Sequence, residues 1–437
     1  MLDNVNFQDN WFKEQKTQII EACAIKYAAL PKQGTREWKI IRLSSFGGSE
    51  LSVLEGVNPY SKMKDLIASK LGLTTFNGSV ATRWGNLFEH ITEQLTARIF
   101  GVDRLWELSS IPGFCANHRF SPDGLGVFPI RCQMEINGVI YNTIEYLSVL
   151  LEYKSPFSTL PNGKIPKHYL PQVKGGICDF DFVDIGLFVN NTYRKCSLSD
   201  FKFDNAYDHK IHTKGDVYKT PIAAGLIRFY QTDEQRRLMS QEFGLGCDSN
   251  PDSDVSSDEE THKDMYRRRK NMTLEERIFH CVELGMMDMG KLGTKKFGAL
   301  LKLYMNGMLS ADFGHPLIFR RELHRIDLVE TQITVESDER DYDKEMKVLT
   351  KTRIAEGGVG VLPWKMFISN MIFQERDDSY KAVIEPRIQE GAAILKDIQR
   401  LVDDEYPSRE VLVERFYTHF ENKGHYIDRQ IEQDGFD

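Results

Sequence analysis

Two short stretches decide the fold of this chain, Ser121–Gly124 (SPDG) and Glu152–Lys154 (EYK). Each lies at the end of an apolar run that is typical of a strand. Because residues two apart in a strand share a face, Glu152 and Lys154 are expected to point the same way and Tyr153 the opposite way. We therefore expect Asp123, at one strand end, to face Glu152 and Lys154 on a neighbouring strand.

These residue types suit the hydrolysis of phosphodiesters. The carboxylates of Asp123 and Glu152 and the carbonyl of Tyr153 are oxygen ligands, which Mg²⁺ prefers. Such an ion stabilises charge on a phosphoryl oxygen, and Lys154 would deprotonate or orient the attacking water. Taken alone, the two motifs have a plainer alternative, a β-turn aspartate and a surface salt bridge on a strand, because both patterns are common in a chain of this length.

The periodicity around these motifs indicates an α/β protein with a mixed sheet. Apolar residues at helical spacing predict helices over 11–30, 63–71, 81–100, 274–309 and 381–401. Short apolar or alternating runs predict strands over 125–128, 133–136, 139–143, 149–153, 183–190, 319–335 and 360–372. The dipeptide Asn137-Gly138 between two of them predicts a tight hairpin.

Further motifs stand around the first two in a definite order. They are Trp38-x-x-x-Arg42, Phe46–Glu50 (FGGSE), Gly56–Tyr60 (GVNPY), Trp84–Glu89 (WGNLFE) and Tyr169–Val173 (YLPQV). The ordered series resembles the phage lambda exonuclease and YqaJ-type viral recombinase nucleases, a branch of the PD-(D/E)XK superfamily, in versions from large DNA viruses. The resemblance covers roughly residues 34–189, with a fainter echo over 374–398.

The resemblance implies a fold and a set of site residues. The fold is a PD-(D/E)XK restriction-endonuclease-like core, a central mixed β-sheet flanked by helices, with large insertions. Asp123, Glu152 and the Tyr153 carbonyl would bind Mg²⁺ or Mn²⁺, with Glu89 holding metal-bound water or a second metal. Lys154 would be the catalytic lysine, and Gln172 would steady that lysine or the water.

A second group of residues would bind the 5′-terminal phosphate of a recessed duplex end: Arg42, Ser49 and Ser121. Arginine and hydroxyl donors are what a phosphate requires. Two departures from the family stand out. The gap from Asp123 to Glu152 is longer than usual, and the hairpin at Asn137-Gly138 is expected to fill it. Thr82 is polar at about the place where the family separates the terminal base pair with an apolar residue.

Composition sets limits on location and partners. The 437 residues carry a net charge of −8, and six of the acids lie in the Ser-rich stretch 247–264, which we expect to be disordered. Seven scattered cysteines without a CxxC pair and the lack of a signal-like or membrane-spanning apolar run indicate an intracellular protein without a membrane. The family resemblance places it in the host cytoplasm, at a viral factory, or in the nucleus.

We expect five segments along the chain. They are an N-terminal helical segment (1–34), the nuclease core (35–246), an acidic linker (247–264), a helical insertion with the closing strand and helix of the core (265–405), and a polar C-terminal tail (406–437).

The resemblance implies a 5′-to-3′ exonuclease on linear duplex DNA in viral recombination, replication or repair. Double-stranded DNA ends would be its partners, with a single-strand annealing protein as a further one, and an oligomer is compatible with the sequence. Two alternatives stay open. One is an endonuclease or resolvase-like enzyme of the same superfamily. The other is a nucleic-acid-binding or host-modulating protein with a residual nuclease site.

Overall fold

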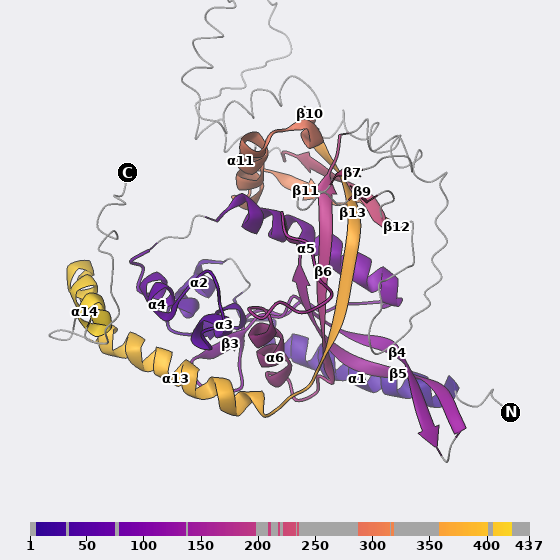
Figure 1. The fold of residues 1–437 in the computed structure, drawn as a ribbon, viewed down its shortest axis with the longest axis horizontal. Helices are drawn as coiled ribbons and strands as arrows, with labels where there is room; N and C mark the ends of the chain where they lie inside the picture. The colour runs from indigo at the N-terminus through magenta and orange to yellow at the C-terminus, as the bar shows by residue number, and fades with distance from the viewer. Residues whose placement is uncertain are drawn as a thin grey trace, which may run out of the picture.

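A mixed β-sheet runs through the centre of the molecule in the computed structural model (Figure 1). Its strands follow the order β11 (Ser310–Asp312), β9 (Ala223–Tyr230), β13 (Gly358–Glu375), β6 (Ile185–Lys195), β5 (Val139–Lys154) and β4 (Gly124–Ile136). Two short strands flank this path, β10 (Met287–Asp288) beside β13 and β12 (Leu317–Ile318) beside β9. Because β5 and β6 are parallel while most other pairs are antiparallel, the predicted α/β fold with a central mixed sheet is confirmed.

The structure describes residues 6–31, 35–74, 78–136, 139–197, 209–210, 217–218, 222–232, 234–235, 287–314, 316–318, 358–400 and 405–421. The expected acidic linker (247–264) and the expected strand over 319–335 lie outside these ranges. Of the helix expected over 274–309, the described part holds β10, a 3-10 turn at Met289–Lys291 and α11 (Thr294–Met305). Within the described residues the predicted helix is confirmed as α11 and is wrong over β10 and the 3-10 turn, while 274–286 lie outside the described ranges.

Strands β4 and β5 form one long hairpin that positions the two deciding motifs. Ile136 pairs with Val139 across the predicted Asn137-Gly138 turn, and the register continues to Gly124 opposite Leu151. The sequence predicts two separate strands within each of β4 and β5. The structure joins each pair into one strand, because the alternation of side chains continues through the polar positions between the two runs. This hairpin fills the long gap between Asp123 and Glu152, as predicted.

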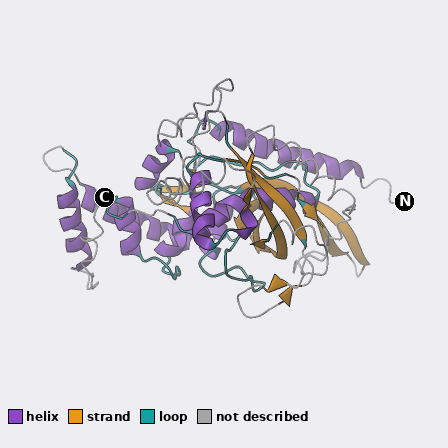
Figure 2. Ribbon diagram, turned by 90° about the horizontal axis from the view of Figure 1, so that it is seen from above, coloured by secondary structure: helices purple, strands orange, loops and turns teal. Residues whose placement is uncertain are grey.

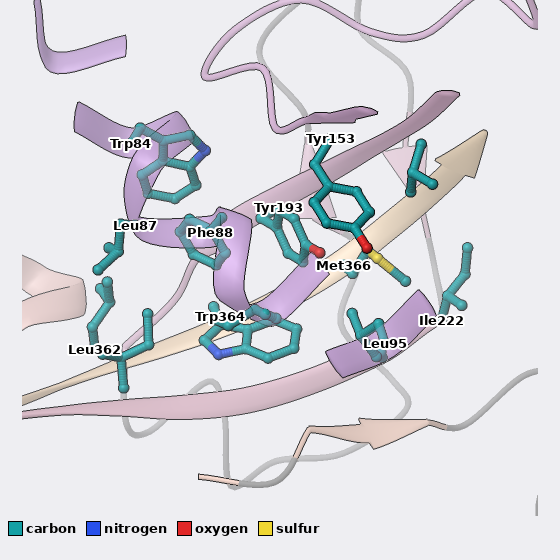
Figure 3. Packing of buried hydrophobic residues seen from close by; sticks show 14 of the residues in the cluster. Trp84, Leu87, Phe88, Leu95, Tyr153, Tyr193, Ile222, Leu362, Trp364 and Met366 are labelled. Atoms are coloured by element: carbon teal, nitrogen blue, oxygen red, sulfur yellow. The ribbon is translucent and has the colours of Figure 1, made fainter. Parts of the chain in front are cut away.

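Helices cover both faces of the sheet (Figures 1 and 2). On one face, α5 (Val80–Phe100) and α11 pack on the sheet through a cluster that includes Trp84, Phe88 and Trp364 (Figure 3). On the other, α1 (Asn6–Tyr27) and α6 (Leu170–Cys178) pack on apolar side chains of β4, β5 and β6. The predicted helices over 11–30 and 81–100 are thus confirmed, with boundaries shifted by a few residues.

A further helical cluster lies beside the sheet and carries part of the cavity wall described below. It comprises α2 (Arg36–Leu43), α3 (Leu51–Leu54), α4 (Met63–Lys70), α13 (Tyr380–Gln399) and α14 (Arg409–Glu421). Most of these helices share an apolar core that includes Leu54, Ile67 and Ile388. The expected polar tail needs correction, because α14 lies within it and buries Phe416 and Phe420 in this core.

A small sheet fixes the segment that carries Ser49. It consists of β1 (Phe46–Gly47), β3 (His118–Phe120) and β2 (Ile111–Pro112), and the 3-10 turn Gly48–Glu50 follows β1. The buried ring of His118 lies between the carbonyl oxygen of Phe46, 2.9 Å from Nδ1, and the carboxylate of Asp179, 3.1 Å from Nε2. Burial alone would lower the pKa of His118, but the hydrogen bond and charge of Asp179, together with the Phe46 carbonyl and the charge of Glu50, raise it above its usual value. Both ring nitrogens face acceptors, which favours the doubly protonated imidazole.

The remaining described strands are β7 (His209–Lys210) and β8 (Val217–Tyr218), which pair with each other. None of the helices in the described ranges is long and apolar enough to cross a membrane.

Candidate active site

One cavity of about 1000 Å³ gathers nearly all the residues that the sequence singles out. Its lining includes Glu89, Asp123, Tyr153, Lys154, Gln172, Arg42, Ser49 and Ser121. Glu152 does not reach the cavity surface, because its side chain is fully buried directly behind Lys154. The two groups that the sequence assigns to hydrolysis and to phosphate binding therefore share one space.

The floor of the cavity is built where β4 begins and β5 ends. Asp123 directly precedes β4, and its Oδ2 accepts a hydrogen bond of 2.7 Å from the backbone N–H of Tyr153. The Tyr153 ring points into the core on the opposite face, as strand alternation requires (Figure 3). Asp123, Glu152 and Lys154 thus meet as the sequence predicts.

Lys154 bridges two oxygens of this floor. Its Nζ donates to Oε1 of Glu152 and, at 3.0 Å, to the carbonyl oxygen of Tyr153. The same ammonium lies 5.2 Å from the centroid of the Tyr169 ring. Burial alone would lower the pKa of Lys154, but the carboxylates of Glu152 and Asp123 raise it, so Lys154 is a cation at neutral pH.

The carboxylates crowd one another. Burial, with the charge of Asp123 adding to it, raises the pKa of Glu152 to about 8. The same two causes raise the pKa of Glu89 to about 7. Burial also raises the pKa of Asp123. Three acids that resist ionisation beside one lysine indicate a site that lacks positive charge.

One face of α5 forms a wall of the cavity. Ser79 caps this helix by accepting from the N–H of Thr82 at 3.1 Å, and Thr82, Asn86 and Glu89 follow at helical spacing along the cavity side. Trp84, from the same motif, is buried in the core, 4.4 Å from Phe88 between ring centroids. Thr82 therefore lies in the cavity wall. It is the polar residue that stands at about the place where the resembled family has an apolar one.

Arg42, which lines the cavity, belongs to a basic cluster that we call the rim: Arg42 with Lys70 and Glu50 packed behind it. One guanidinium nitrogen of Arg42 lies 2.5 Å from Oε1 of Glu50, and Nζ of the buried Lys70 lies 2.8 Å from Oε2. The N–H of Gly47 also donates to Glu50, at 2.8 Å. Arg42 is therefore ion-paired with Glu50. Because Arg42 and Lys70 share this one carboxylate, the rim keeps a net positive charge.

The floor carries oxygen donors that could hold a hard divalent cation. Oε2 of Glu152 is buried and has no hydrogen-bond partner, which is costly unless a ligand binds it. Among the described residues, no three Asp, Glu, His or Cys side chains form a metal site by themselves. The set assigned here instead combines the carboxylates of Asp123 and Glu152 with the carbonyl of Tyr153, and such oxygens fit a hard divalent cation.

Some residues of the cavity escaped the sequence analysis. Asn190 of β6 lines it and is 6% exposed, and Tyr60 projects from it at 82% exposure. The ring of Tyr60 meets His168 edge-to-face at 5.6 Å, and His168 lies 4.2 Å from Tyr169. A row of rings therefore leads from Lys154 to solvent. The Tyr60 motif was visible in the sequence, but nothing local to it predicts this row.

Three comparisons with known proteins bear on this site. No protein-family model matches the chain. A protein of African swine fever virus is similar over 225 residues, with 28% identity in the Tick/Malawi isolate and in the Badajoz strain. The match covers 49% of this chain and 64% of the relative, so the chain spans less than two thirds of the length of these viral relatives.

Among solved structures, an alkaline exonuclease from Laribacter hongkongensis (LHK-Exo) is similar, with 20% identity and a TM-score of 0.26. The overlap covers 36% of this chain and 74% of that chain. The same exonuclease in complex with dAMP gives a TM-score of 0.27. At such scores the likeness carries no argument about activity, which must come from the residues of the cavity.

Proposed function

We propose that this chain is a metal-dependent exodeoxyribonuclease of the PD-(D/E)XK type, which degrades one strand of linear duplex DNA from a 5′-phosphorylated end. One observation carries the proposal: Asp123 and Lys154, with Glu152 buried directly behind Lys154, line the same cavity as Arg42 of the basic rim. A cavity with these two charges can bind a terminal phosphate at one wall and a phosphodiester at the floor.

Asp123, Glu152 and the Tyr153 carbonyl would hold Mg²⁺ or Mn²⁺, and Glu89 would act through bound water. Such an ion supplies charge stabilisation at the phosphoryl oxygens and lowers the pKa of bound water. Lys154 keeps its proton beside the carboxylates, so it acts as a cationic donor that orients water or a phosphate oxygen. Gln172, on α6, lines the same cavity and would steady either group.

Arg42, Ser49 and Ser121 would set the polarity of degradation. They line the same cavity as Lys154, so a 5′-phosphate bound by them would direct the adjacent linkage toward Lys154. The products would be mononucleotides and a 3′ single-stranded overhang, the substrate of a single-strand annealing protein. The row Tyr60, His168 and Tyr169 offers stacking surfaces to bases. The similarity to proteins of African swine fever virus supports a viral setting. In that setting the enzyme would act in recombination, replication or repair, in the cytoplasm or nucleus of the host cell.

The test uses linear and circular duplex, each with and without a 5′-phosphate, in Mg²⁺ and then in EDTA. We expect loss of linear DNA with a 5′-phosphate in Mg²⁺ alone. Glu152→Gln should be inactive, since a neutral amide is a poor ligand for a hard cation. Nicking of circles would instead identify an endonuclease, and binding without cleavage would identify a DNA-binding protein with a residual site.

A further inference from the structure

Asn190 presents an unsatisfied polar group to the cavity. Its side chain is 6% exposed, and its Oδ1 is buried without a hydrogen-bond partner. A buried amide oxygen left unpaired is destabilising, and such groups usually have a partner. The next residue shows the difference: Asn191, on the opposite face of β6, donates to the Tyr193 hydroxyl at 3.1 Å and accepts from Ser369 at 2.7 Å.

The register of the sheet places Asn190 beside Lys154. Strands β5 and β6 are parallel, and Lys154 and Asn190 are Cα partners, as are Glu152 and Phe188. Paired residues on neighbouring strands point to the same face. Consistent with this, the Tyr169 ring lies near both the Lys154 ammonium, at 5.2 Å, and the Phe188 ring, at 5.7 Å.

Lys154 meanwhile takes oxygens that the proposed function assigns to a cation. Its ammonium binds Oε1 of Glu152 and the carbonyl oxygen of Tyr153. An ammonium and a divalent cation repel each other, so a cation bound to the free Oε2 of Glu152 and to the Tyr153 carbonyl would weaken the hold of Lys154 on both groups. Another acceptor nearby would then stabilise the displaced ammonium.

We propose that Asn190 is a positioning residue whose Oδ1 accepts the Lys154 ammonium when a divalent cation takes Glu152 and the Tyr153 carbonyl. This inference rests on the proposed function, because it concerns the same site. Asn190 has the three properties that such an acceptor needs: an unpaired oxygen, a place in the cavity lining and a position next to Lys154. Its oxygen holds Lys154 toward the cavity, where substrate enters.

The experiment compares Asn190→Leu, which removes the acceptor, with Asn190→Asp, which keeps an oxygen at the same place. Asn370→Leu is the matched control, since Asn370 pairs with Asn190 from β13 and is 9% exposed but is not part of the cavity lining. Two quantities are measured for each protein. One is the rise in melting temperature on titration with Mg²⁺, and the other is kcat and KM for 5′-phosphorylated duplex.

Asn190→Leu should weaken the Mg²⁺-dependent rise in melting temperature, because Lys154 stays on Glu152 and competes with the ion. It should also lower kcat about 10- to 100-fold with little change in KM, the effect of one hydrogen bond to a charged group. Without Mg²⁺ its melting temperature should equal or exceed that of the parent, since an unpaired polar group is removed. Asn190→Asp should keep most of kcat, and Asn370→Leu should resemble the parent.

A parent-like Mg²⁺ response and kcat in Asn190→Leu would overturn the inference, and so would equal losses in Asn370→Leu. If Asn190→Leu does not fold, Asn190→Ala is measured in the same way against Asn190→Asp. Failure of the proposed function looks different, because the parent itself would not cleave DNA. The Mg²⁺ titration of the melting temperature then still decides the role of Asn190.

Discussion

Replacing Arg42 with alanine tests the polarity of the proposed exonuclease. Arg42 lines the cavity, lies 4.7 Å from the Trp38 ring centroid and binds Glu50 at 2.5 Å. Glu50 keeps Lys70 and the Gly47 N–H as partners after this change, so Arg42→Ala should leave the fold of the rim intact. The variant therefore removes a phosphate donor without leaving a buried charge unpaired.

The size of the effect follows from the charges of the rim. Arg42 and Lys70 with Glu50 sum to +1 − 1 + 1 = +1, so a terminal phosphate meets net positive charge even though Glu50 already binds one guanidinium nitrogen. One charge-assisted hydrogen bond contributes about 1.5–3 kcal/mol. That corresponds to roughly 10- to 150-fold in the rate preference for a 5′-phosphate over a 5′-hydroxyl end.

The assay measures the rate of cleavage on both ends for the parent, Arg42→Ala and Arg104→Ala. Arg104 is a matched control, because it also pairs with a glutamate, Glu21 at 2.9 Å, and lies 5.0 Å from a tryptophan ring but is not part of the cavity lining. Arg42→Ala should slow the phosphorylated substrate and leave the hydroxyl substrate nearly unchanged. If the ratio of the two rates is the same in the parent and in Arg42→Ala, the phosphate assignment is wrong, although the floor would survive that result.

Three further predictions concern the floor, pH and packing. Lys154→Ala should abolish cleavage while duplex binding persists, as a gel-shift assay would record; full activity would remove the assigned site. Because the pKa of His118 is raised in the fold, its pair with Asp179 contributes stability below about pH 6.5 and loses it as pH rises through the raised value. Chemical denaturation across pH 5–9 should show this loss of stability in the parent and not in His118→Asn. At pH 5 the variant should be less stable than the parent by about 3–5 kcal/mol. Parallel profiles of stability against pH in the two proteins would contradict a stabilising ion pair of His118 with Asp179. Gly176→Ala should lower the free energy of unfolding by about 1–3 kcal/mol, since its Cβ would lie 2.3 Å from Phe120. Gly85→Ala, in open space within α5, should raise the free energy of unfolding by up to about 1 kcal/mol. Equal effects of the two substitutions on the melting temperature would contradict this difference.

Local patterns were enough to predict the hairpin and the meeting of Asp123 with Glu152, whereas the roles assigned to these residues came from the family resemblance. Alternation along β4 and β5 and the Asn137-Gly138 turn are properties of adjacent residues, and they bring Asp123 to Glu152 without any long-range information. The helices α1, α4, α5 and α13 likewise follow from apolar spacing within one segment. These elements could be predicted because residues close to one another in the sequence determine them.

Long-range contacts explain what the sequence did not predict. Strand β9 is held by pairing with β13, more than a hundred residues further along the chain, and Gly225 in β9 leaves room for the Trp364 ring. The helix α14 was missed because only a few apolar residues, among them Phe416 and Phe420, bind it to α13 in a polar segment. The unpaired Oδ1 of Asn190 beside Lys154 follows from the pairing of β5 with β6, which lie apart in sequence, and no motif indicates it.

The charges of the cavity also suggest why a duplex end would bind in one orientation. Counting Glu89 of the α5 wall with the floor, the three acids and Lys154 sum to −3 + 1 = −2 once the pH exceeds the raised pKa values of Glu89, about 7, and Glu152, about 8, whereas the rim sums to +1. A phosphate therefore meets attraction at the rim and repulsion at the floor until a divalent cation compensates the floor. Because a terminal 5′-phosphate carries more charge than an internal phosphodiester, it should occupy the rim first. The next linkage along the strand would then lie at the floor, beside Lys154, so the order of the charges favours cleavage from the 5′ end.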